Sequence, residues 1–169
     1  EADDVIASFV EQYVSDEVHG LVVTGDKDLH QLISPDVRVY DPLKSETFNE
    51  ENVVSKWGVT ADKIVDVQTL MGDPTDNIPG VKGIGEVRAV TMINAYGTVG
   101  AVYEHRHEFS DAIRKALETA DLPLLTRLVE LNRDLDIDID SEDLEFHGLN
   151  MKAARPIFEE LGFTRWLKE

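Results

Sequence analysis

Residues 70–86 read Leu-Met-Gly-Asp-Pro-Thr-Asp-Asn-Ile-Pro-Gly-Val-Lys-Gly-Ile-Gly-Glu, and the interpretation of the whole chain turns on them. Between Gly72 and Gly85 lie four of the chain's 11 glycines and two of its 6 prolines. This density of glycine and proline interrupts regular secondary structure and is typical of a structured loop. We therefore predict a loop over 72–85, followed by a helix over Glu86–Tyr96.

The segment before this loop has the pattern of an α/β core. Apolar residues recur at helical spacing over Ala2–Tyr13, and the apolar runs Leu21–Gly25 and Val37–Tyr40 have the β-branched composition of strands. A short helix is expected over 29–33, between the two strands. The order helix–strand–helix–strand predicts an α/β fold with a parallel sheet, although two strands make only a thin one.

The chain from residue 49 onward is predicted to be mainly helical. Asn49 and Thr60 can cap helices that run to Trp57 and Met71. Further helices are expected near residues 110–119, 122–131 and 150–161. We predict two domains, with residues 1–71 in the α/β core and 72–169 in a helical region whose segment 72–97 carries the glycine-rich loop.

Composition limits the possible functions. The chain has no cysteine, so any bound metal must be held by oxygen or imidazole ligands. No run approaches the roughly 20 apolar residues of a membrane span, and we expect a cytoplasmic protein with no membrane partner. The net charge of −18 argues by itself against a polyanionic partner such as DNA. That argument fails if the acids gather around cations and the basic residues lie on one strip.

Three short acidic clusters carry the predicted chemistry. Asp26 and Asp28 directly follow the strand that ends at Thr24, where open α/β folds collect ligands. Seven converging carboxylates would raise one another's pKa values, so such a set is stable chiefly around hard cations, and we predict Mg²⁺ or Mn²⁺. Two such ions would support hydrolysis of a phosphodiester. The seven acids are Glu1, Asp3, Asp4, Asp26, Asp28, Asp73 and Asp76.

Simpler explanations exist for each of these features. Aspartate is favoured at helix caps and turns, and for any single cluster that explanation is the better one. The loop over 78–85 resembles a helix–hairpin–helix element, in which glycines let backbone N–H groups approach a DNA phosphate. Glycine-rich turns before helices are nevertheless common. The co-occurrence of the three acidic clusters and the loop favours a metal-dependent nuclease.

Four stretches together resemble the 5′-nuclease family, above all the 5′→3′ exonuclease domain of bacterial DNA polymerase I and its stand-alone and phage relatives. Flap endonucleases are more distantly similar. The four stretches are Glu-Ala-Asp-Asp at 1–4, Thr-Gly-Asp-Lys-Asp-Leu-His-Gln-Leu at 24–32, residues 70–86, and Phe-Glu-Glu-Leu-Gly-Phe-Thr-Arg-Trp-Leu at 158–167. The resemblance implies a PIN-like partial parallel-sheet nuclease core followed by a helical region with a helix–two-turn–helix element.

The resemblance also implies roles for particular residues. Glu1 and Asp3 are expected to serve a first metal ion, and Asp26, Asp28 and Asp73 a second, while Asp4 and Asp76 match supporting acids. Within this set Asp3, Asp26, Asp28 and Asp73 are the expected catalytic residues. In the loop, the expected DNA-binding residues are Lys82, Gly83, Gly85 and Arg88, and a K⁺ ion on the loop carbonyls is a further expectation. The expected substrate is branched, nicked or 5′-flap DNA at the nucleoid.

This sequence departs from the family in two respects. Relatives have a further N-terminal stretch with two more aspartates and a basic helical arch, so we expect a fragment or one half of a split nuclease that cleaves DNA poorly alone. A linked polymerase domain, or a chain that supplies the missing part, is an expected partner. At 86–89, Glu-Val-Arg-Ala stands where relatives usually read Glu-Lys-Thr-Ala, which moves a phosphate-contacting cation by one position.

Alternatives remain open at this point. A non-catalytic DNA-structure-binding or scaffold subunit would fit the missing ligands, whereas a phosphatase of the Asp-x-Asp kind lacks its other motifs. The acids of 134–145 have the spacing of a calcium loop without its glycine, and their alternation favours an extended strand or edge. His105 and His107 could bind a transition metal but fit a solvated segment better. Trp57 and Trp166 are predicted to be packing residues.

Overall fold

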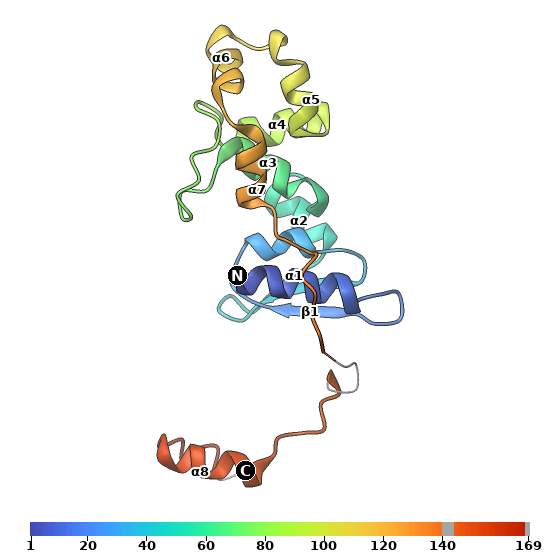
Figure 1. Cartoon of the computed structure of the whole chain (residues 1–169), viewed down its shortest axis with the longest axis vertical. Helices are drawn as coiled ribbons and strands as arrows, with labels where there is room; N and C mark the ends of the chain where they lie inside the picture. The colour runs from blue at the N-terminus through green and yellow to red at the C-terminus, as the bar shows by residue number, and fades with distance from the viewer. Residues whose placement is uncertain (140–143, 168–169) are drawn as a thin grey trace. The chain divides into compact units, whose positions relative to one another are not determined.

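The computed structural model of the chain describes residues 1–139 and 144–167, which form two compact units, Glu1–Ile137 and Asp138–Glu169 (Figure 1). No helix within these residues is long and apolar enough to cross a membrane. The predicted domain boundary after residue 71 stays a prediction. In chain order the elements, with η for 3₁₀ helices, are α1 (Ala2–Tyr13), β1 (Gly20–Val23), η1 (Asp28–Leu32), β2 (Val37–Asp41), β3 (Glu46–Phe48), α2 (Glu50–Trp57), η2 (Ala61–Lys63), α3 (Ile64–Met71), α4 (Glu86–Tyr96), α5 (Val99–Glu104), η3 (Arg106–Glu108), α6 (Asp111–Thr119), α7 (Leu122–Val129) and α8 (Met151–Glu160).

The sheet of the first unit has the order β1-β2-β3. β1 pairs with β2 in parallel from Gly20↔Val37 to Val23↔Tyr40, which confirms both predicted strands and their orientation. β3 adds to β2 in antiparallel register and was not predicted, because its three residues form no apolar run. The sheet thus directs the carboxyl ends of β1 and β2 to one edge, where Asp26 and Asp28 follow β1.

One face of β1 is covered by protein and the other is open. Val22 is buried, whereas Leu21 and Val23 on the opposite face are 60% and 62% exposed. Because successive strand residues point to opposite faces, this alternation identifies the face that packs on the core. The other face presents apolar side chains to solvent.

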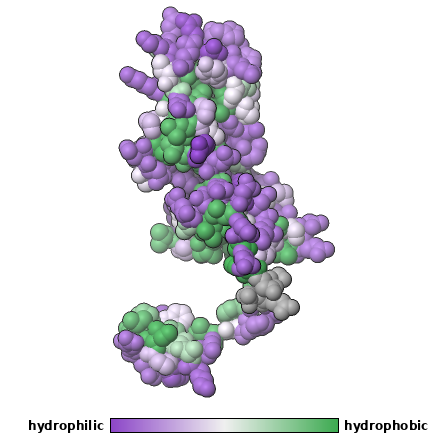
Figure 2. Space-filling view, in the orientation of Figure 1, coloured by the Kyte–Doolittle hydropathy of each residue, from purple (hydrophilic) through white to green (hydrophobic). Residues whose placement is uncertain are grey.

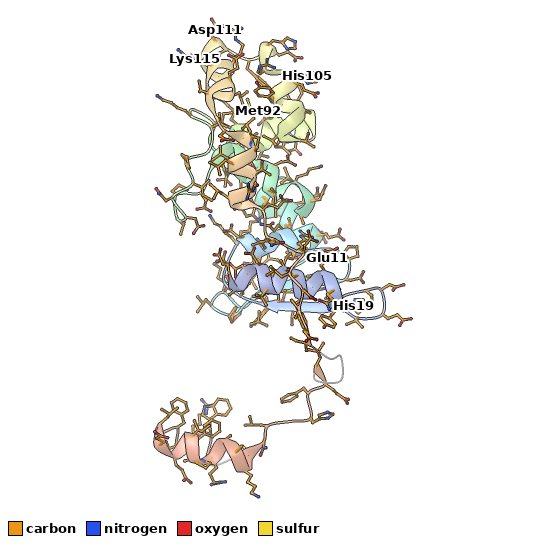
Figure 3. The ribbon with its side chains drawn as sticks, viewed as in Figure 1. Glu11, His19, Met92, His105, Asp111 and Lys115 are labelled. Carbon is orange, nitrogen blue, oxygen red and sulfur yellow. The ribbon has the colours of Figure 1, made fainter. Side chains whose placement is uncertain are left out.

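α3 lies at the centre of the helical part, where it packs against α4 and α7 (Figure 1). Its side chains Ile64, Val67 and Leu70 are completely buried in a core that continues from the sheet to α7. α5 and α6 extend this part away from the sheet, so that His105, Asp111 and Lys115 lie far from Glu11 on α1 (Figure 3). α5 was not predicted, and α7 ends two residues earlier than expected.

The glycine-rich loop is built by close backbone contact. Asp73 and Ile78 pair in antiparallel orientation through N–H···O bonds of 2.9 and 2.8 Å. Gly72 and Gly80 have φ angles of +76° and +60°, and a Cβ on Gly80 would lie 2.3 Å from the nitrogen of Gly72. Only glycine tolerates both the left-handed backbone and this approach. The buried side chain of Val81 anchors the loop to the hydrophobic core.

The second unit has a different character. No residue of α8 is buried, and Trp166 is 54% exposed, so its predicted packing role is wrong. Hydrophobic surface is visible on this unit in Figure 2. Trp57, in contrast, is 6% exposed and confirmed as a packing residue. Residues 134–139 are irregular and do not form a strand, and 140–143 of the weighed calcium loop lie outside the described residues.

Candidate metal centre

A single cleft of about 660 Å³ in the first unit is lined by all seven acids that the sequence singles out. They come from three separate places: the start of α1, the loop after β1, and the hairpin that follows α3. The parallel sheet and the backbone crossing of the glycine loop bring these places together. The cleft acids are Glu1, Asp3, Asp4, Asp26, Asp28, Asp73 and Asp76.

Three of these acids form a tight group. Carboxylate oxygens of Asp28, Asp73 and Asp76 all lie within 4.8 Å of one another, a separation at which one ion can contact all three. Among residues 1–139 and 144–167 this is the one group of three or more acidic, histidine or cysteine side chains close enough to share an ion. The composition of the group differs from the expected Asp26, Asp28 and Asp73, because the hairpin turn places the exposed Asp76 carboxylate beside those of Asp28 and Asp73. The individual ligand roles stay predictions.

Asp73 is held rigidly at the bottom of the cleft. It is 1% exposed, and its Oδ1 accepts a 2.9 Å hydrogen bond from the backbone N–H of Thr75. Its Oδ2 accepts a hydrogen bond from the Lys27 ammonium. Burial alone would raise the pKa of Asp73, but the hydrogen bond and charge of Lys27 outweigh it and lower that pKa. Asp73 is therefore ionised at neutral pH and already compensated by one cation.

The other acids oppose one another's ionisation. Burial, with the nearby charge of Asp26, raises the pKa of Asp28 despite a hydrogen bond from Gln68. Burial and the charges of Asp26, Glu1 and Asp4 likewise raise the pKa of Asp3. Asp26 and Asp28 are also linked, because the Asp28 N–H donates to Asp26 Oδ1 at 2.9 Å. A divalent cation would relieve this repulsion.

Gln68 is a cleft residue that sequence reasoning missed. Its Nε2 donates a 2.6 Å hydrogen bond to Asp28 Oδ1 from the buried side of α3. The side chain is 1% exposed, and its Oε1 is buried without a hydrogen-bond partner among the described residues. Such an acceptor is costly unless a ligand supplies a partner. The available signal was an amide next to Val67, on the side of the helix that also carries the apolar Ile64.

The far wall of the cleft comes from the end of α7. Gln31 fixes this segment through its Nε2, which donates to the Val129 carbonyl, and its Oε1, which accepts from the Leu131 N–H, both at 3.1 Å. Asp4 adds a 2.8 Å bond from the Asn132 N–H. Arg127 and Glu130 thereby line the cleft, and neither was predicted, because about 100 residues separate them from Gln31.

The predicted DNA-binding residues lie on the outer surface of the glycine loop. Gly83, Gly85 and Arg88 line one shallow surface hollow, and Lys82 is exposed beside them. The Arg88 guanidinium donates a hydrogen bond to the carbonyl of Gly83, which ties the start of α4 to the turn before it. The predicted elements are thus brought together, and contact with DNA stays a prediction.

His105 and His107 do not form a metal group with any third ligand among the described residues. The ring of His105 contacts the Ala101 carbonyl through Nδ1 at 2.9 Å, and the two rings stack with centroids 6.3 Å apart. These contacts are those of a surface helix end, as the sequence favoured.

Two family models together match residues 1–152. The N-terminal resolvase-like domain of 5′-3′ exonucleases matches residues 1–58, and the C-terminal SAM fold of 5′-3′ exonucleases matches residues 59–152. The second model alone matches more than half of the chain. It includes the glycine loop and the helices that follow it.

Curated relatives extend the similarity over the whole chain. The 5′-3′ exonuclease of Aquifex aeolicus is 36% identical over 169 residues, which are 100% of this chain and 58% of that protein. DNA polymerase I of Rhizobium leguminosarum is 37% identical over 97% of this chain and 16% of its own length. DNA polymerase I of Bacillus subtilis is 34% identical over 99% of this chain and 20% of its own length. The chain thus spans less than two thirds of each relative.

Solved structures support the fold. The T5 5′-exonuclease with bound divalent metal ions (zinc) has a TM-score of 0.69 at 24% identity and covers 78% of this chain and 50% of its own. The catalytic core of Rad2 has a TM-score of 0.59 at 17% identity, and the match covers 94% of this chain and 60% of the Rad2 chain. At these identities the likeness establishes the common fold, with its small sheet and its helical region.

Proposed function

Since this chain belongs to the 5′-3′ exonuclease family, we propose that it supplies the carboxylate cluster and the DNA-gripping loop of a structure-specific 5′-nuclease. The reaction would be hydrolysis of phosphodiesters in DNA flaps, primers or 5′ ends. The observation that carries the proposal is the convergence of seven acids from three distant segments on one cleft. Because the chain spans only part of its relatives, competence for the complete reaction is part of the proposal.

The cleft fits the divalent cations that such a reaction needs. Its donor set is carboxylate oxygen, which Mg²⁺ and Mn²⁺ prefer over nitrogen or sulfur. Repulsion among the acids and the unpartnered Gln68 Oε1 both point to a ligand between them. We propose that Asp28, Asp73 and Asp76 hold one ion and that Glu1, Asp3 and Asp26 serve a second. Bound divalent ions would supply charge neutralisation and an activated water.

The protein's own groups have three tasks in this scheme. The backbone crossing at Gly72 and Gly80 fixes the hairpin that carries Asp73 and Asp76. Gln68 orients Asp28 through its 2.6 Å hydrogen bond. Lys27, which pairs with Asp73, keeps the deepest carboxylate ionised before an ion arrives. These contacts hold the ligands in position and lower the reorganisation needed on binding.

DNA binding is assigned to the outer surface of the loop. A solved relative of the same fold, the T5 flap endonuclease, was crystallised with DNA and metal ions. In this chain we propose that backbone N–H groups near Gly83 and Gly85, with the side chains of Lys82 and Arg88, contact DNA phosphates. A K⁺ ion on the loop carbonyls would have to compete with Arg88 for the Gly83 oxygen.

Calorimetric titration of the chain with Mn²⁺ tests the proposal. We expect binding by the wild-type chain and its loss in Asp73→Asn. Asp111→Asn is the matched control, because Asp111 is an exposed aspartate on α6 that does not line the cleft. Absence of Mn²⁺ and Mg²⁺ binding by the wild type, or equal binding by Asp73→Asn, would favour a non-catalytic DNA-binding subunit instead.

A further inference from the structure

Arg127 occupies an unusual position in the first unit. It lies in the last turn of α7 and lines the acidic cleft, and among the described residues that do so it is the single lysine or arginine. Lys27 is close to the cleft acids but is turned to Asp73 at the bottom. Arg127 also lines a neighbouring polar cavity of about 540 Å³, so it lies on the wall that separates the two.

The guanidinium of Arg127 has no protein partner within the part of the chain that the structure describes. The residue is exposed, and no ion pair or hydrogen bond of its side chain is found among residues 1–139 and 144–167. Arg133, which lines the neighbouring cavity, provides a contrast, because it bonds to the Gln31 carbonyl at 2.9 Å and pairs with Glu11. An arginine that lines a cleft with eight acids and pairs with none of them is available for an anionic ligand.

The position of Arg127 is fixed by the fold although its side chain is free. Thr126, its neighbour on α7, bonds through its hydroxyl to that of Thr69 at 3.2 Å. The two hydrogen bonds of Gln31 to Val129 and Leu131 hold the following turn. A cation presented by a rigid wall loses little freedom on binding a ligand.

We propose that Arg127 binds a phosphodiester group of the nucleic-acid strand that lies across the cleft. The inference rests on the proposed function for the presence of that strand. An arginine matches phosphate geometry through two parallel N–H···O bonds, which makes it well suited to a backbone phosphate. Glu130 and the seven cleft acids oppose the approach of a phosphate, so Arg127 and the bound cations together make it favourable. Arg127 thus selects strands with an intact charged backbone.

The first experiment measures binding of a 5′-flap DNA to the chain with Ca²⁺ in place of Mg²⁺. We expect Arg127→Gln to weaken binding by about tenfold or more, and Arg127→Lys to restore part of the affinity. Arg114→Gln is the matched control, because Arg114 is an arginine on α6 that pairs with Asp111. A charge-neutral methylphosphonate is then placed at each DNA position in turn. At one position the loss should equal that of Arg127→Gln and not add to it, whereas additivity at every position would overturn the proposal.

The second experiment separates this proposal from the proposed function. The ¹⁵N-labelled chain is titrated with thymidine 3′,5′-bisphosphate in the presence of Ca²⁺, as in the first experiment, and the Nε–Hε resonances of its arginines are followed by NMR. A shift confined to the resonance that Arg127→Lys removes supports the phosphate contact, even if the chain cuts no DNA. An unmoved Arg127 resonance overturns it, even if the chain is an active nuclease.

Discussion

The acidic cleft and the glycine loop are neighbours in sequence, but they are stabilised in opposite ways. Asp73 and Asp76 lie between Gly72 and Gly80, in one hairpin. The carboxylates repel one another, as the raised pKa values of Asp3 and Asp28 indicate. The glycines pack backbone against backbone with no side chain between them. A rigid backbone crossing therefore holds the acids in an arrangement that their own charges oppose.

The largest expected effect comes from disrupting the backbone crossing of the glycine loop. Gly80→Ala forces a Cβ within 2.3 Å of backbone at a φ of +60°. We expect a loss of at least about 3 kcal/mol in the free energy of unfolding, measured by urea denaturation. Gly100→Ala is the control and should be neutral or stabilising by about 0.5–1 kcal/mol, because Gly100 lies in α5 with an ordinary φ and a Cβ there would meet only the Thr98 Oγ1, at 3.8 Å. Equal losses in both variants would contradict the backbone account.

The next largest effect comes from neutralising the repulsion between the cleft acids with a divalent ion. Mg²⁺ or Mn²⁺ at 100 times its dissociation constant should raise the free energy of unfolding by about 2.7 kcal/mol, because the ion binds only the folded arrangement. Thermal melting with and without the ion measures this gain. Gly80→Ala should reduce it together with stability, and Asp73→Asn should abolish it. A gain that survives Asp73→Asn would place the ion elsewhere.

A smaller effect concerns the support beneath the cleft. His30 is buried in η1, accepts a 3.0 Å hydrogen bond from Trp57 Nε1, and has its pKa lowered by burial, and by Lys56 and Lys44, to about 4. A folded pKa below the unfolded value of 6.5 means that its contribution is complete above pH 6.5 and is lost as pH falls toward 4. By pH 5 we expect a loss of about 2 kcal/mol.

The measurement is urea denaturation of the wild type and His30→Gln between pH 7 and 5. The glutamine keeps an acceptor for Trp57 but cannot be protonated in this range. The variant should therefore show a flatter dependence on pH in that window. An identical slope in the two proteins would assign the pH dependence to other groups.

The smallest expected effect concerns the repulsion between carboxylates inside the cleft. Asp28→Asn removes one of the repelling charges while leaving an oxygen for Gln68, so without metal the variant should be more stable by about 0.5–1 kcal/mol. The same change should weaken Mn²⁺ binding. Asp62→Asn, at an exposed aspartate beside Lys63, is the control. It should neither stabilise the metal-free protein nor weaken Mn²⁺ binding. A less stable Asp28→Asn variant would mean that repulsion is not the dominant interaction at this carboxylate.

Sequence reasoning identified the local parts of the site because their chemistry is encoded in short motifs. The acids and glycines of 70–86 specify the hairpin, and the apolar run before Asp26 specifies the strand that precedes it. The grouping of Asp76 with Asp28 and Asp73 depends on the turn at Asn77, which has a positive φ. The residue type alone does not predict that backbone conformation. The sequence therefore predicted the set of acids better than its internal arrangement.

The parts that were missed depend on long-range packing. Gln68 and Arg127 both line the cleft because α3 and α7 pack together, and Gln31 of η1 fixes the end of α7 beside them. A single sequence does not reveal which of its elements meet. β3 was missed because a three-residue edge strand is defined by its partner and not by its own apolar pattern. The exposed Trp166 was misjudged because apolar neighbours along a helix do not guarantee that another element covers it.

Anomalous X-ray diffraction from crystals of the chain grown with Mn²⁺ can show whether the cleft acids hold divalent cations. We predict an anomalous peak bounded by the carboxylates of Asp28, Asp73 and Asp76. Crystals of the Asp73→Asn variant grown with Mn²⁺ in the same way should lack that peak. Wild-type crystals with Mn²⁺ bound elsewhere and no peak between these three carboxylates would contradict the account.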